Sequence, residues 1–229
     1  MHFLDQNIKG HCARFGVDFQ QLLEDFGVDN VHELSILDLE AFAEENETDL
    51  YSLLFQPLSI PQHLLTKLKA IKLLIVDIDG VMTDGGMYYS EGGDQMKKYN
   101  TKDGRAIIEA QKRGLKIGII SSGMHDNMVL NRAKTLGVEQ VYVGLESKID
   151  VLGRWCAEMK LDLSEVAIVG DDINDLSVIE KVGVSFCPSD AVQVVKRRSD
   201  IVLSTAGGKG CVRELIDNYL LEQPLGSSN

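Results

Sequence analysis

The sequence has little that would crosslink the chain or anchor it in a membrane. Its 229 residues include only four cysteines, none of them in a CxxC pair, so neither a disulfide framework nor a cysteine metal site is expected. No apolar run approaches the ~20 residues that a membrane-spanning helix needs. The first ten residues, MHFLDQNIKG, lack the basic and then apolar pattern of a secretory signal. These absences predict a cytoplasmic protein that does not enter a membrane.

Basic residues are scarce in the first 60 positions. Only Lys9 and Arg14 oppose twelve acidic residues there, so this segment carries −10 of the chain's formal charge of −12. The stretch 34–55 loosely resembles the closing helices of a helix-turn-helix repressor domain. Binding to DNA phosphates requires basic residues, however, so the charge argues against nucleic acid as a partner. A helical module for subunit or partner contact is expected instead.

Composition predicts two units in the chain. The N-terminal segment has apolar residues at helical spacing, with Asp18 and Ser35 as candidate N-caps, and is expected to be all helical. Residues 56–62 hold two of the four prolines, as linkers do. The expected divisions are a helical module at 1–60, a second domain at 63–222 and a disordered tail at 223–229.

Six short apolar runs, several rich in Val and Ile, follow the linker. They lie in segments 72–79, 114–122, 140–146, 165–172, 183–188 and 200–205. The amphipathic stretches between them are 105–114, 128–137, 149–160, 175–183 and 191–199. This alternation predicts an α/β fold with a doubly wound parallel sheet. One interruption, residues 87–104, is expected to form a β-hairpin with its turn at 91–94, projecting from the carboxyl edge of the sheet.

Polar side chains occur where four of these strands should end. They are Asp77, Asp79, Ser121, Lys148, Asp171, Asp172 and Asp175. Ligands of open α/β sheets bind at the carboxyl ends of the strands, so these residues should meet at one edge. Clustered carboxylates repel one another, and a hard divalent cation such as Mg²⁺ relieves that repulsion. The sequence therefore predicts a Mg²⁺ site there.

The same residues are suited to phosphoryl transfer. A carboxylate such as Asp77 can form an aspartyl-phosphate, and Asp79 is suited to donate a proton. The charge that develops on phosphoryl oxygens can be stabilised by a metal, by Lys148 and by the hydroxyl of Ser121. Singly, each feature has an ordinary reading: a DxD pair as a turn, Lys148 as a surface lysine, Ser121 as a helix cap. Their combination with GDDxxD favours the catalytic reading.

Two further lysines remain ambiguous. Lys97 and Lys98, in the expected hairpin, are suited to attract an anionic substrate. Exposed charges on a strand also protect a sheet edge from unwanted pairing. Both readings stay open.

Four motifs give the chain a family resemblance. DIDGVMTDG, the hydroxyl at IISS, Lys148 and GDDINDLS resemble, in order, the motifs of haloacid dehalogenase-like phosphatases. The segments 79–104 and 207–215 are similar to the hairpin and C-terminal tail of one capless branch, the sugar-acid phosphatases that resemble 3-deoxy-D-manno-octulosonate 8-phosphate phosphatase. The resemblance covers roughly residues 70–220 and does not reach the N-terminal module.

The resemblance implies a Mg²⁺-dependent phosphomonoesterase of sugar phosphates from lipopolysaccharide or sialic acid biosynthesis. Asp77 would be the nucleophile and a metal ligand, and Asp79 the general acid and base, with its backbone carbonyl on the metal. Ser121 and Lys148 would hold the phosphoryl group. Asp171 would bind Mg²⁺ directly, with Asp172 and Asp175 supporting it. The residues implied to contact the sugar acid are Asn100, Thr101, Lys102, Asp103, Gly104 and Arg132, together with Lys209.

The branch also implies a homotetramer in which the hairpin and the tail close a neighbour's active site. One departure concerns the substrate: where the branch has Thr-Gly-Arg, this chain has Ser121, Ser122, Gly123 and Met124. Methionine cannot replace an arginine's bidentate grip on a carboxylate. The sequence therefore leaves octulosonate 8-phosphate and nonulosonate 9-phosphate both open as substrates.

Two other functions compete with the phosphatase. One is a catalytically retired interaction or assembly protein whose acidic helical module binds a partner. The other is a DNA-binding regulator that senses a sugar phosphate, which the charge balance disfavours. The intact acidic motifs argue for an enzyme.

Overall fold

The computed structural model describes residues 3–46, 48–55, 58, 60, 62–92, 95–123 and 127–221. Two compact units divide the chain, Met1–Leu65 and Thr66–Asn229. The expected tail at 223–229 and most of the expected linker lie outside the described residues. None of the described helices is long and apolar enough to cross a membrane.

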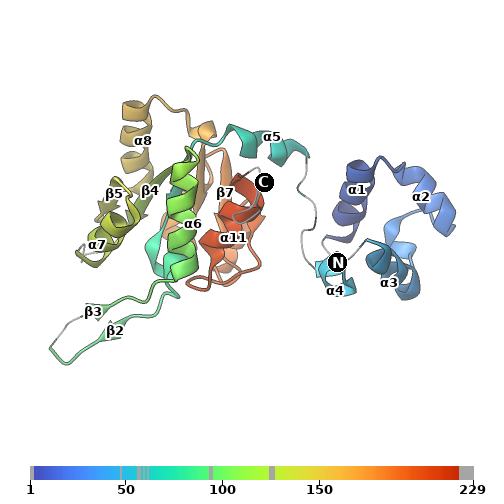
Figure 1. Ribbon diagram of the computed structural model, residues 1–229, viewed down its shortest axis with the longest axis horizontal. Coiled ribbons are helices and arrows are strands. Elements are labelled where there is room, and N and C mark those ends of the chain that lie inside the picture. The colour runs from blue at the N-terminus through green and yellow to red at the C-terminus, as the bar shows by residue number, and fades with distance from the viewer. Residues whose placement is uncertain are drawn as a thin grey trace. The chain divides into compact units, whose positions relative to one another are not determined.

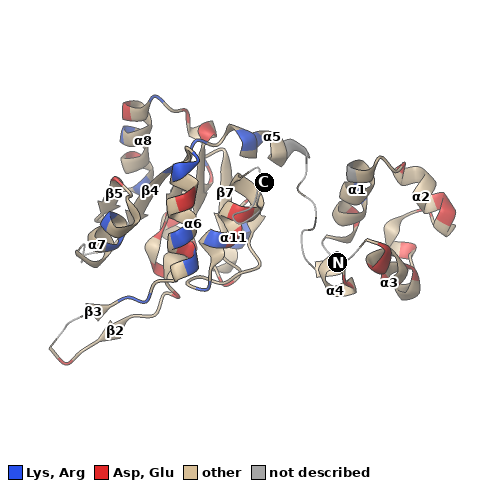
Figure 2. Ribbon diagram, viewed as in Figure 1, with Lys and Arg blue, Asp and Glu red and all other residues tan. Residues whose placement is uncertain are grey.

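The N-terminal unit is helical, as predicted. Its helices are α1 (Leu4–Phe15), α2 (Phe19–Phe26), α3 (Ile36–Glu45) and α4 (Leu50–Phe55), with a short 3-10 turn at Val31–Glu33. Both predicted caps are confirmed: the Asp18 side chain accepts a hydrogen bond from the Gln21 N–H, and Ser35 forms a capping box with Asp38. Acidic residues are prominent on α2 and α3 (Figure 2).

The second unit contains the predicted parallel sheet. Its strands are β1 (Leu73–Val76), β4 (Lys116–Ser121), β5 (Gln140–Val143), β6 (Val166–Val169), β7 (Val184–Cys187) and β8 (Ile201–Val202). The spatial order is β5-β4-β1-β6-β7-β8, and all neighbouring pairs are parallel. From β1 the chain runs through β4 and β5 on one side and returns to β6 on the other. The carboxyl end of β1 is therefore the switch point at which such sheets bind ligands.

Helices cover both faces of this sheet (Figure 1). They are α6 (Thr101–Lys112), α7 (Asn127–Leu136), α8 (Lys148–Met159), α9 (Leu176–Ile179), α10 (Gln193–Arg198) and α11 (Cys211–Leu215). Helix α5 (Gln62–Ala70) precedes β1 in the chain. Leu73 and Ile75 share a buried cluster with side chains of α8, α9 and α10. Leu74 and Val76 alternate with them and face the other side, where α6 and α11 pack together.

The hairpin is shorter than predicted. Strand β2 (Tyr88–Tyr89) pairs antiparallel with β3 (Gln95–Met96), and the arm they form projects from the second unit (Figure 1). The prediction that the hairpin continues to residue 104 is wrong, because Thr101 begins α6. Asn100 caps this helix by accepting a hydrogen bond from the Lys102 N–H. The end of the expected hairpin is thus the first turn of a helix.

Candidate active site

A buried lysine lies between two buried carboxylates at the end of β1. Asp77 directly follows the strand, and its N–H donates to the Val169 carbonyl (3.1 Å), which holds it beside β6. Lys148 is the first residue of α8. Its Nζ lies 2.9 Å from Asp77 Oδ1 and 2.6 Å from Asp175 Oδ1, and all three residues are buried. The fold thereby joins three chain segments at one point.

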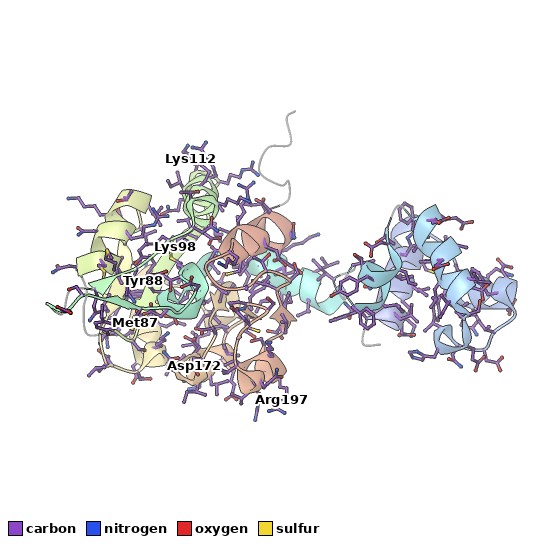
Figure 3. All side chains as sticks on the ribbon, turned by 90° about the horizontal axis from the view of Figure 1, so that it is seen from below. Met87, Tyr88, Lys98, Lys112, Asp172 and Arg197 are labelled. Carbon is purple, nitrogen blue, oxygen red and sulfur yellow. The ribbon has the colours of Figure 1, made fainter. Side chains whose placement is uncertain are left out.

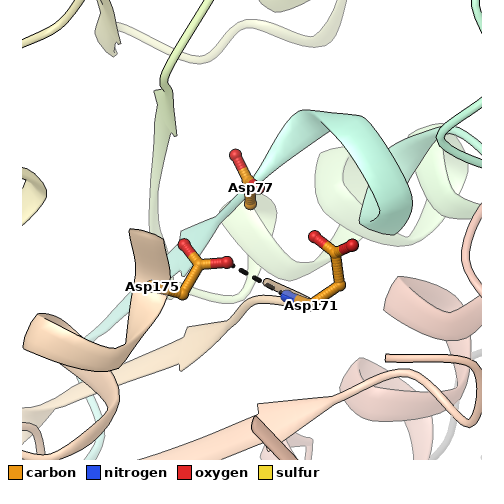
Figure 4. Close-up of side chains that lie close together, drawn as sticks. All are labelled: Asp77, Asp171 and Asp175. Atoms are coloured by element: carbon orange, nitrogen blue, oxygen red, sulfur yellow. Dashed lines mark hydrogen bonds between the residues drawn. The ribbon is translucent and has the colours of Figure 1, made fainter. Parts of the chain in front are cut away.

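Asp171 completes a group of three carboxylates with Asp77 and Asp175. One oxygen from each lies within 4.8 Å of the others. Figure 4 shows the three side chains and the hydrogen bond from the Asp171 N–H to Asp175 Oδ2 (3.0 Å). A Cβ on Gly80 would collide with the Asp171 carboxylate, so glycine is what allows the loop after β1 to come this close.

The charges of this group are poorly balanced by the protein alone. Burial, followed by the charge of Asp175, raises the pKa of Asp77 to about 7 against the opposing pull of Lys148. Burial, followed by the charges of Asp77 and Asp175, raises the pKa of Asp171 to about 7. For Lys148, burial opposes the charged form, but the two carboxylates outweigh it and raise the pKa. Three acids thus share one lysine.

The donor set fits a Mg²⁺ ion. Asp175 uses Oδ1 for Lys148 and Oδ2 for the N–H groups of Asp171 and Asp172. Asp171 Oδ1, in contrast, is buried and has no hydrogen-bond partner among the residues that the structure describes. Asp77 contacts Lys148 through Oδ1 and lies in the same group as Asp171. Oxygen ligands from Asp77 and Asp171 are of the type that a hard cation prefers.

The carboxylates of Asp79 and Asp172, two further residues expected at the metal, have other partners. Asp172 is exposed (Figure 3), and its Oδ1 accepts a hydrogen bond from the Ile173 N–H (2.7 Å). The Asp79 carboxylate contacts Lys97 Nζ, and Thr83 Oγ1 lies 3.5 Å from its Oδ1. In the described structure neither carboxylate belongs to the three-acid group.

Ser121 is the last residue of β4 and is buried. The next residue, Ser122, accepts a hydrogen bond through Oγ from Asn174 Nδ2 (3.1 Å), which links the loop after β4 to the loop after β6. The expected departure from the family pattern extends to Met124, but residues 124–126 lie outside the described part of the chain.

The structure brings three of the expected sugar-contacting residues together. Arg132 Nη2 donates to the Asn100 carbonyl (3.3 Å), and a Cβ on Gly104 would collide with the same guanidinium. Asp103 is buried and accepts a hydrogen bond from the Arg213 N–H (2.8 Å). The other three expected residues, which are exposed, are Thr101, Lys102 and Lys209.

The loop that begins at Gly207 (the glycine loop) joins this group to the loop after β1 that carries Asp79 (the acidic loop) of the same chain. Asn100 Nδ2 donates to the Gly208 carbonyl (3.2 Å), and the Gly208 N–H donates to the Val81 carbonyl (2.8 Å). A Cβ on Gly207 would collide with the Gly80 carbonyl oxygen. The loop that begins at Gly207 therefore supports the segment that carries Asp79.

Sequence reasoning missed two residues of this site and left the role of a third open. Asn174 ties two loops together, and Tyr99 lies under Arg132, with 5.3 Å between the guanidinium carbon and the ring centroid. Lys97, for which two readings were open, contacts Asp79. Its alternation with the exposed Lys98 was the available signal, but alternation alone does not say what a buried side chain meets.

Known sequences resemble this chain over most of its length. A family model for haloacid dehalogenase-like hydrolases matches residues 146–215. The 3-deoxy-D-manno-octulosonate 8-phosphate phosphatase of Salmonella typhi is 37% identical over 164 residues, which are 72% of this chain and 87% of the relative.

Solved structures give the same result. The 3-deoxy-D-manno-octulosonate 8-phosphate phosphatase of Yersinia pestis superposes with a TM-score of 0.67 at 31% identity and covers 69% of this chain and 85% of its own. The enzyme of that name from Moraxella catarrhalis, solved with magnesium, phosphate and KDO, has a TM-score of 0.67 at 28% identity. Its match covers 72% of this chain and 94% of that one.

Proposed function

The chain belongs to the haloacid dehalogenase-like hydrolases, and on that premise we propose that it is a Mg²⁺-dependent phosphatase of a sugar-acid phosphate. The observation that carries this proposal is the meeting of Lys148 with the three carboxylates of Asp77, Asp171 and Asp175. A catalytically retired protein has no need for buried carboxylates that repel one another in this way. The interaction protein considered from the sequence is therefore not favoured.

The substrate class follows from the relatives. The Salmonella typhi relative is named for octulosonate 8-phosphate, and the Moraxella catarrhalis structure holds KDO with phosphate. We infer a 2-keto-3-deoxy sugar acid phosphate, either octulosonate 8-phosphate or nonulosonate 9-phosphate. Arg132, held beside Asn100, is the cation proposed to lie near the sugar acid.

In the proposed mechanism, an oxygen of Asp77 attacks phosphorus and the bond from phosphorus to the sugar oxygen breaks. The sugar oxygen takes the bonding electron pair and a proton from Asp79. Asp79 then takes a proton from water, which attacks the phosphoryl group, releases phosphate and restores Asp77. Lys148 and Ser121 stabilise the phosphoryl oxygens. Mg²⁺ bound by Asp77 and Asp171 would neutralise negative charge on the phosphoryl group and the carboxylates.

We also propose that the enzyme is a cytoplasmic homotetramer. Support for assembly comes from the hairpin, where Tyr88 and Met96 face each other across the two strands and remain 53% and 67% exposed. Figure 3 shows Met87 and Tyr88 on this arm. Exposed apolar side chains gathered on one element are typical of a protein contact.

A phosphate-release screen tests the proposed function. The panel contains octulosonate 8-phosphate, nonulosonate 9-phosphate and unrelated sugar phosphates, each with Mg²⁺ and with a chelator. We expect release from one of the two sugar acids, and only with Mg²⁺. Absence of release from the whole panel would contradict the proposal and favour an interaction protein.

A further inference from the structure

We propose that Lys97 is a positioning residue that holds the Asp79 carboxylate for proton transfer. The inference rests on the proposed function, because it assigns a task to Asp79 in the phosphatase reaction. No sequence motif points to this role, and the contact joins the hairpin arm to the acidic loop of the same chain.

Burial distinguishes Lys97 from its surroundings. It directly follows β3, whose last residue, Met96, is 67% exposed. The Lys97 side chain is only 7% exposed, whereas the side chain of its partner Asp79 is 40% exposed. Lysine is rarely buried unless its ammonium is paired. The ion pair with Asp79 therefore explains why the Lys97 side chain is buried against the protein and does not extend into solvent.

Exposure alternates along the residues that follow β3. Met96 and Lys98 are exposed, whereas Lys97 and Tyr99 are partly buried, which is the pattern of side chains that point alternately to two sides. Burial, followed by the charge of Asp79, raises the pKa of Tyr99 to about 12, against the opposing charge of Arg132. The ion pair of Lys97 thus brings the segment after β3 against Asp79.

Charge complementarity supports the assignment. Lys148 is already engaged by Asp77 and Asp175, and Lys97 is the cation that contacts Asp79. Lys97 and Thr83 both lie against Oδ1 of Asp79. No hydrogen bond to Oδ2 is present among the described residues, so that oxygen is the one available to exchange a proton with the substrate or water.

The role of Lys97 can be separated from substrate binding by the leaving group. A sugar alkoxide leaves only with a proton, whereas nitrophenolate is stable enough to leave without one. The value of kcat/KM covers steps up to departure of the leaving group, before water attacks. Loss of a residue that acts through Asp79 should therefore slow hydrolysis of the sugar phosphate and spare p-nitrophenyl phosphate.

The experiment compares Lys97→Met with Lys98→Met, its exposed neighbour, on both esters. The sugar ester is whichever of octulosonate 8-phosphate and nonulosonate 9-phosphate the unchanged chain hydrolyses. Proton transfer contributes about 10²–10⁴-fold to such reactions, and we expect Lys97→Met to lose about 10–100-fold in kcat/KM on the sugar ester. On p-nitrophenyl phosphate we expect a loss below about threefold. Lys97→Arg should recover most of the activity, and Lys98→Met should resemble the unchanged chain.

A double variant completes the test. If Lys97 acts through Asp79, Lys97→Met should add little to the loss already caused by Asp79→Asn. Additive losses, or equal losses on both esters, would overturn the inference and leave the proposed function standing. Failure of the unchanged chain to hydrolyse either ester would overturn the proposed function and this inference with it.

Discussion

At the scale of single residues, the site depends on two glycines that let backbones approach closely. A Cβ on Gly80 would collide with the Asp171 carboxylate, and a Cβ on Gly207 with the Gly80 carbonyl oxygen. Gly80 also has a φ of 83°, which side chains rarely tolerate. Because both positions are glycines, the acidic loop that carries Asp79 can pack between the Asp171 carboxylate and the loop that begins at Gly207.

Gly207→Ala should disturb this loop directly. We expect a loss of about 1–3 kcal/mol in the free energy of unfolding, because a backbone atom must move. We also expect kcat/KM to fall about 10–100-fold, since small displacements of reacting groups are costly. Urea unfolding and phosphate release measure the two effects.

Gly153→Ala is the matched control. Gly153 lies within α8, and a Cβ there would meet nothing within 4 Å. Alanine should raise stability by about 0.5–1 kcal/mol and leave activity unchanged. A Gly207→Ala variant as stable and active as Gly153→Ala would refute the close approach.

Much of the proposed site, but not all of it, could be predicted from the residue types and their positions in the sequence. The carboxylates of Asp77 and Asp171 were predictable, because acids at strand ends of a parallel sheet converge. The contact between Lys97 and Asp79 was not, since it depends on how the hairpin folds back. The exposure of Asp172 depends on the turn at Ile173–Asp175, which the motif alone does not specify.

At the scale of elements, Asp103 joins α6 to α11. It is buried in the first turn of α6, and its Oδ1 accepts a hydrogen bond from the Arg213 N–H of α11. Burial raises the pKa of Asp103 to about 6, against the hydrogen bonds of Arg213 and Val212 and the charge of Arg132. Its Oδ2 has no partner among the described residues, which suits a protonated carboxyl.

This pKa predicts a pH-dependent stability. Because the pKa of Asp103 is raised above its ordinary value of 3.8, the folded chain binds more protons between about pH 4 and pH 6 than the unfolded chain. The stabilisation that the folded chain gains by protonating Asp103 is fully present below that window and is lost as the pH rises through about 6. The free energy of unfolding falls by at most about 3 kcal/mol over this range. Asp103→Asn, which keeps an acceptor for Arg213, should lack this loss.

Urea unfolding of both chains at several pH values measures the difference. Trp155, the chain's single tryptophan, lies on α8 and reports on the second unit. The Asp103→Asn chain should gain stability relative to the unchanged chain as the pH rises from about 4 to about 7. Parallel stability curves would contradict the assignment.

The elements themselves were largely predictable. All six sheet strands lie within the segments expected from their apolar runs, because strands buried on both faces exclude polar residues. The start of α6 was not recognised. The polar run from Asn100 to Lys102 is typical of a turn, and equally of a helix cap followed by a first turn, and only the packing of α6 on α11 decides between them.

At the scale of the whole molecule, the chain combines an acidic helical unit with a unit of the haloacid dehalogenase-like hydrolase family. The residues of the proposed site, and the hydrogen bonds that hold them, lie in the second unit. The fold class was predictable because alternating strands and helices allow few other arrangements. The task of the acidic unit was not predictable, because its charge excludes partners more readily than it identifies one.

The proposed tetramer predicts a role for the hairpin arm. Tyr88 and Met96 are a cross-strand pair with exposed side chains, and burial in a subunit contact would stabilise the assembly. Light scattering should give four times the chain mass of 25.3 kDa for the unchanged protein. Replacing both residues with serine should lower that mass, whereas Lys112→Ser, on exposed α6 surface, should not. A monomeric unchanged protein would contradict the proposal.

The most direct test of the whole account is Mg²⁺-dependent phosphate release by the Asp77→Asn variant. Asparagine keeps the shape of the side chain but removes the nucleophilic carboxylate, so we expect kcat to fall by more than about a thousandfold on every ester that the unchanged chain hydrolyses. The unchanged chain should also gain about 80 Da at Asp77 when it is quenched during turnover, which is the mass of one phosphoryl group. A variant that still releases phosphate at the original rate with Mg²⁺ would contradict the assignment of Asp77 and the mechanism built on it.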